Sequence, residues 1–122
     1  MLVIRERQFK ALARAALSRW LVNHLQEHFP DECEELGLAV VREAVRHGIE
    51  RAASHGFTYE VHISKYVDLM FALGRDFDTN PLTPWASAML ADRSVNASAR
   101  MDRLCDAAVA HLKAADAVGL EV

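Results

Sequence analysis

The chain has 122 residues, of which 52% are apolar and 25% charged, with only 5 glycines and 3 prolines. This length suits one domain with its own core, and an alanine-rich composition poor in glycine and proline predicts packed helices rather than sheet. The net charge of −3, with basic and acidic residues interleaved, argues against a nucleic-acid-binding protein.

The first predicted helix spans residues 4 to 28. Its apolar residues recur at steps of three and four and form one broad stripe, which includes Phe9, Leu12, Trp20 and Leu25. Pro30 ends this helix, because the residue before a proline avoids the α region. The stripe predicts that this helix packs against a partner surface.

A short acidic segment follows the first helix. Its acids are Asp31, Glu32, Glu34 and Glu35, and negative charge is favourable in the first turn of a helix. The segment is either a solvated turn or a docking patch for a basic partner. We place part of a partner-contact surface here.

Two longer helices are predicted in the middle of the chain. Residues 38 to 54 carry one apolar face, and Gly48 within it indicates the close approach of another helix. Residues 59 to 73, with Thr58 as the N-cap, are apolar around most of the circumference, so this helix should be the most buried. Asp68 lies inside that helix and should be paired, for example with an arginine.

An acidic turn, residues 75 to 78, separates these helices from the last two. The turn is either a structural element anchored by Phe77 and an ion pair of Arg75, or a partner surface on which Asp76 and Asp78 are exposed. Thr83 and Pro84 predict the start of a short helix that ends near residue 92, and a final helix spans residues 96 to 117. The prediction is an all-α fold, a single compact bundle of five to six helices in one domain, residues 1–122.

Four large side chains are expected to meet in the core of this bundle. They are Tyr66, Met70, Phe71 and Trp85. The two cysteines, Cys33 and Cys105, form no CxxC pattern, which predicts reduced thiols, with Cys33 the more exposed. Residues 1 to 6 contain no apolar signal segment, and no apolar run reaches the roughly 20 residues that cross a bilayer. We therefore expect a cytoplasmic protein that does not bind a membrane.

Metal binding is an alternative function that rests on two histidines. His24 and His28 share a helical face, and Asp31 follows them as a possible third ligand. The glutamate that makes an HExxH motif specific is absent, because Leu25 follows His24. We favour two histidines at a helix end, predict no cofactor and assign no catalytic residue. A self-associating structural module, with homo-oligomers, is the third alternative.

Four motifs stand out along the second half of the chain: YVDLMF at residues 66–71, GRDFD at 74–78, PWA at 84–86 and RMDRL at 100–104. In these motifs the sequence resembles a family of short helical bacterial proteins encoded beside effectors of the type VI secretion system. The resemblance implies a cytoplasmic accessory protein, an effector co-chaperone or adaptor that contacts the secreted effector or its chaperone. It carries over no catalytic residue.

Overall fold

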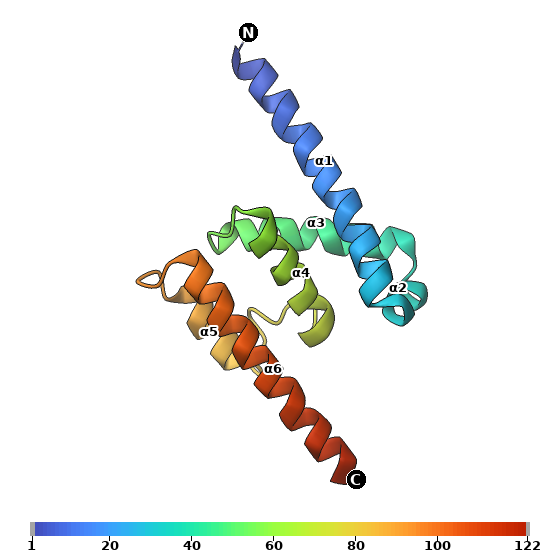
Figure 1. Cartoon of the computed structure of the whole chain (residues 1–122), viewed down its shortest axis with the longest axis vertical. Helices are drawn as coiled ribbons and strands as arrows, with labels where there is room; N and C mark the ends of the chain where they lie inside the picture. The colour runs from blue at the N-terminus through green and yellow to red at the C-terminus, as the bar shows by residue number, and fades with distance from the viewer. Residues whose placement is uncertain (1, 122) are drawn as a thin grey trace.

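The computed structural model describes residues 2–121, and the surroundings of side chains from residue 10 to residue 117. Within residues 2–121 the chain forms six α-helices and no strand (Figure 1). The helices are α1 (Leu2–His28), α2 (Pro30–Leu36), α3 (Leu38–Ser54), α4 (Glu60–Leu73), α5 (Pro84–Ala91) and α6 (Ala97–Glu121). The predicted all-α bundle is confirmed. No helix in the described range has both the length and the apolar character needed to cross a membrane.

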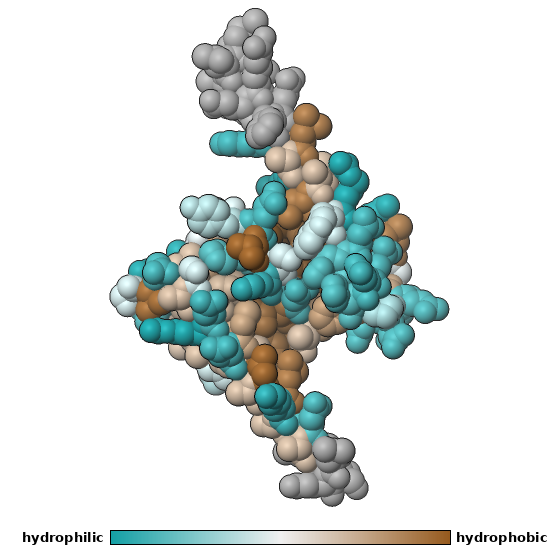
Figure 2. Space-filling model, in the orientation of Figure 1, coloured by the Kyte–Doolittle hydropathy of each residue, from teal (hydrophilic) through white to brown (hydrophobic). Residues whose placement is uncertain are grey.

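The helices are arranged around α4. This helix packs against α3, α6 and α1, while α2 bridges α1 and α3, and α5 packs on α6. The N-terminal half of α1 and the C-terminal part of α6 extend past the other helices (Figure 1). Figure 2 shows both apolar and polar side chains on α1 below the residues drawn in grey. The ends of α1 and α6 therefore protrude from the part of the bundle in which the helices pack together.

The contact between α3 and α4 depends on Gly48. A Cβ atom added at this position would lie 2.8 Å from both Sδ of Met70 and Cγ2 of Val67. The prediction of a close helix approach at Gly48 is confirmed. The side of α3 that faces α4 and α1 is buried and contains Val41, Ala44, Val45, Ile49 and Ala52.

The segment between α4 and α5 folds inward around Phe77. Gly74 ends α4 with φ of 121°, a conformation that suits glycine. The Phe77 side chain is fully buried, and its ring centroid lies 5.1 Å from that of Tyr66. Thr83, which precedes α5, donates its hydroxyl to the Phe77 carbonyl at 2.8 Å. The predicted anchoring role of Phe77 is confirmed.

Several predicted positions differ in the structure. Tyr66 and Met70 are buried, whereas Phe71 and Trp85 are only partly buried at the edge of the core. Thr58 does not cap α4, which begins after Tyr59 without a side-chain cap. The prediction that Cys33 is the more exposed of the two cysteines is wrong. The short helix α2 turns Cys33 toward the core, while Cys105 stays partly exposed. Burial, with a contribution from Glu32, raises the pKa of the Cys33 thiol.

Candidate partner-binding groove

A groove of about 370 Å³ lies between α2, α3 and α4, and its surface is largely apolar. Its apolar lining consists of Leu36, Val40, Ala44, Met70 and Phe71. Leu36 and Val40 keep 45% and 46% of their surface exposed, although both are large aliphatic residues. The groove therefore presents apolar surface to solvent between three helices.

Acidic residues from α2 give the groove a negative edge. Glu32 and Glu35 line it and stand three positions apart, so they share one side of the helix. Arg75, just past the end of α4, is the basic residue of the lining. Its guanidinium forms two hydrogen bonds with the Glu43 carboxylate, one of 2.7 Å. These bonds lower the pKa of Glu43. Because the positive charge of Arg75 is paired with Glu43, the remaining charge at the groove is the negative charge of Glu32 and Glu35. The predicted Arg75 ion pair is confirmed.

The other predicted acids lie outside this lining. Asp31 and Glu34 are exposed on α2, and Glu34 lines a separate hollow beside Gly37. Asp76 is exposed in the turn, where one carboxylate oxygen lies 3.5 Å from Nε2 of His47. Of the predicted contact residues, Glu32 and Glu35 therefore line the groove together with Arg75 at the start of the turn. Asp31, Glu34 and Asp76 lie outside the lining.

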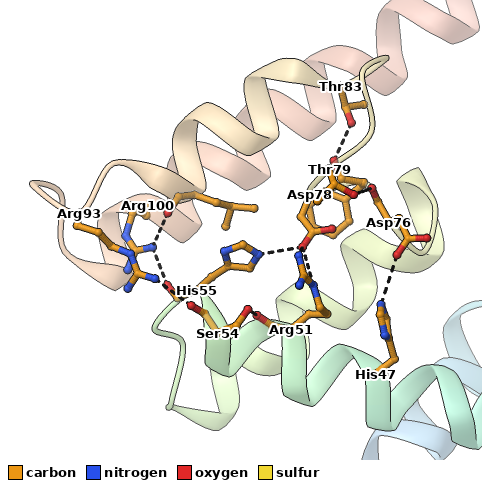
Figure 3. A network of polar contacts seen from close by, with 12 residues as sticks. His47, Arg51, Ser54, His55, Asp76, Asp78, Thr79, Thr83, Arg93 and Arg100 are labelled. Atoms are coloured by element: carbon orange, nitrogen blue, oxygen red, sulfur yellow. Dashed lines mark hydrogen bonds and ion pairs between the residues drawn. The ribbon is translucent and has the colours of Figure 1, made fainter.

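The expectation that Asp78 lies on an exposed partner surface is wrong, because Asp78 is buried. Its side chain is 1% exposed and accepts hydrogen bonds from Nε of Arg51 and Nε2 of His55, both at 2.9 Å (Figure 3). The inward turn at Phe77 brings Asp78 with it, and a buried carboxylate requires such partners. Burial alone would raise the pKa of Asp78, but the hydrogen bonds from His55 and Arg51 hold it below its ordinary value.

Other polar contacts of this region fasten the end of α3 to α5 and α6. Arg100 is buried and donates Nη1 to the carbonyls of His55 at 2.8 Å and Leu90 at 3.2 Å (Figure 3). Arg93 donates to the Ser54 carbonyl at 2.9 Å. The Ser54 hydroxyl donates a hydrogen bond to the carbonyl of Arg51. These contacts satisfy the carbonyls at a helix end, which assigns the cluster a structural role.

The histidine pair on α1 takes part in a contact between helices. Nε2 of His24 lies 2.8 Å from Oδ1 of Asp68, so the partner of Asp68 is a histidine and not the suggested arginine. The His28 ring lies 4.5 Å from the His24 ring, centroid to centroid. Among the described residues, no group of three or more His, Cys, Asp or Glu side chains is arranged to hold a metal ion. Asp31 therefore does not complete a three-ligand site with them.

The apolar part of the groove is absent from the sequence prediction. Phe71 was assigned to the core, and Val40 lies next to the buried position Val41 on α3. The signal available in the sequence was the pair of large aliphatic residues Leu36 and Val40, which lie on either side of Gly37. No family model, curated protein or solved structure that was compared matches this chain.

Proposed function

We propose that this protein is a non-enzymatic accessory protein that binds a protein partner through the groove between α2, α3 and α4. The observation that carries the proposal is the solvent-open apolar lining beside Glu32 and Glu35, with the charge of Arg75 already paired. Grooves of this kind suit an amphipathic helix. Charge complementarity favours a partner segment that carries Lys or Arg beside its apolar residues.

The more specific part of the proposal is a role beside the type VI secretion system. The resemblance at residues 66–71, 74–78, 84–86 and 100–104 supports an effector co-chaperone or adaptor in the cytoplasm that contacts an effector or its chaperone. Glu32 and Glu35 are the main contact residues in this proposal. Asp31, Glu34 and Asp76 extend the negative surface around them, and Asp78 contributes only through the fold.

Co-expression with the neighbouring effector or chaperone, followed by pull-down and size-exclusion chromatography, tests the proposal. We expect a complex that the double substitution Glu32→Lys and Glu35→Lys abolishes. The matched control reverses two exposed acids on α6, Asp106→Lys and Asp116→Lys, and should leave the complex intact. Circular dichroism and thermal melting of both variants check the fold. No complex with any neighbour, or equal loss in the control, would overturn the proposal.

Two rival functions give different outcomes with the purified protein. Stoichiometric zinc or iron that is lost on His28→Ala would replace the proposal with a metal-binding function based on His24 and His28. A concentration-dependent dimer without any other partner would identify a self-associating module. Elemental analysis and sedimentation velocity measure these two outcomes.

A further inference from the structure

A pair of opposite charges lies at the groove between α2, α3 and α4. Glu43 is on α3, between the lining residues Val40 and Ala44 in the chain, but does not itself line the groove. Arg75 does line it and follows Gly74, the residue that caps the end of α4. Glu43 and Arg75 are 32 positions apart, so the packing of α3 against α4 brings them together.

The contact between Glu43 and Arg75 is bidentate. Nη2 of Arg75 donates to Oε1 of Glu43 at 2.7 Å, and Nη1 donates to Oε2. This is the strong form of an arginine–carboxylate contact, because two parallel hydrogen bonds fix both planar groups. Both side chains remain partly exposed, at 44% for Arg75 and 47% for Glu43. Since exposed ion pairs contribute little to folding, the pair matters mainly for the charge at the groove.

The other charged groups around this pair lie outside the groove lining. Asp76 follows Arg75 in the chain, but one of its carboxylate oxygens lies 3.5 Å from Nε2 of His47. Arg46 and His47 are the basic residues of α3 that contribute to the electrostatic environment of Glu43. Neither they nor Asp76 line the groove. The charge that Arg75 presents to a bound partner therefore depends chiefly on Glu43.

The net charge of the groove follows from this pairing. Glu32 and Glu35 line the groove, and neither forms an ion pair with any described residue. While Arg75 is paired with Glu43, the two acids give the groove a negative charge, which favours a basic partner. Without Glu43, the positive charge of Arg75 would offset the charge of one of these acids.

We propose that Glu43 is a specificity-determining residue of the groove, because its pairing with Arg75 makes the groove prefer a basic helix over an acidic one. Glu43 acts through Arg75 and not by contact with the partner, so its effect should disappear when Arg75 is absent. Differences in charge of this kind discriminate between partners that share the same apolar residues. The inference rests on the proposed function and adds to it a residue outside the contact surface.

Two synthetic peptides test the proposal with the whole chain. Each peptide has roughly 18 residues, about five helical turns, with a Leu and Ala stripe that is flanked by Lys in one peptide and by Glu in its twin. Fluorescence anisotropy of the labelled peptides measures both affinities. We expect wild type to prefer the Lys peptide. Glu43→Gln should lower that affinity about threefold at low salt, and less at high salt.

Matched variants show whether the effect passes through Arg75. Glu50→Gln is the control, because Glu50 is also an exposed acid of α3 beside an arginine, Arg14 at 3.8 Å, and does not line the groove. This variant should leave the affinity for the Lys peptide unchanged. Adding Arg75→Gln to Glu43→Gln should recover most of the lost affinity, because the groove regains its net charge. Circular dichroism checks the fold of each variant.

The pairing can also be measured without a peptide. The hydrogen bonds from Arg75 hold the pKa of the Glu43 carboxyl below its ordinary value. An NMR titration of this carboxyl should therefore show a lowered pKa in wild type, and Arg75→Gln should raise it toward the ordinary value. An ordinary pKa of Glu43 in wild type would overturn the proposal.

Two further results would overturn the proposal. They are an equal effect of Glu43→Gln and Glu50→Gln on the Lys peptide, and no recovery when Arg75→Gln is added. The groove remains the binding site in either case, provided that Glu32→Lys with Glu35→Lys abolishes binding of the Lys peptide. If wild type does not bind this peptide, or if that double variant binds it equally well, the groove proposal fails and this inference fails with it.

Discussion

Asp78 accepts a hydrogen bond from Nε of Arg51 at 2.9 Å, and this contact ties the segment after α4 to the last turns of α3. The two residues are 27 positions apart in the chain. Asp78 is buried and also bonded to His55, whereas Arg51 keeps part of its surface exposed. The pair therefore stabilises the fold, while the neighbouring acid Asp76 remains on the surface.

Asp78→Asn should destabilise the protein by about 2–3 kcal/mol, because it removes a charged acceptor from Arg51 and His55. Urea denaturation measures the change in the free energy of unfolding. The matched control is Asp76→Asn, two residues earlier and exposed, which should cost less than about 0.5 kcal/mol. Similar losses in the two variants would contradict the structural distinction between the two acids.

The stability of the protein should fall in acid in part through Asp78. The folded state holds the pKa of Asp78 below its ordinary value of 3.8. Its contribution is therefore fully present above that value and is lost as the pH falls through the lower folded pKa. Urea midpoints between neutral pH and the acid limit should fall less steeply for Asp78→Asn than for wild type. Parallel curves would show that Asp78 does not contribute to the acid dependence.

Gly48→Ala should destabilise the protein by about 1–2 kcal/mol, although alanine is the better helix former. The new methyl group meets Val67, whose β-branched side chain is stiff and fully buried, and Met70. The double variant with Val67→Ala should cost less than the sum of the two single changes, because the smaller side chain leaves room. Thermal melting measures all three variants. Additive costs would show that the helices do not touch here.

Phe71→Ala and Phe77→Ala should separate a groove residue from a core residue. Phe77 is fully buried, so its loss should cost roughly 3–5 kcal/mol. Phe71 is partly buried and faces the groove, so its loss should cost about half as much and should also weaken partner binding. Chemical denaturation and the partner pull-down provide the two measurements. A larger loss for Phe71 would return it to the core position that the sequence predicted.

The helices were predictable from the sequence because local interactions determine them. Residues 38 to 54 were predicted as one helix and form α3 with the same bounds, since a 3.6-residue apolar period and flanking glycines act within the segment. The start of α5 at Pro84 and the close approach at Gly48 were predictable for similar reasons. The first two features depend on residues near in the chain, and the close approach at Gly48 was predictable because a glycine inside a helix leaves room for a neighbouring helix.

Burial and pairing were decided by the tertiary structure. The sequence placed Asp78 on the surface and Cys33 as the more exposed thiol, and both are buried because distant helices cover them. It also treated the apolar residues of α1 as one face, whereas Leu17, Leu21, Val22 and Leu25 meet the bundle and Leu12 is exposed. Periodicity shows that a helix has an apolar side, but only the position of the neighbouring helices determines which part of that side is covered.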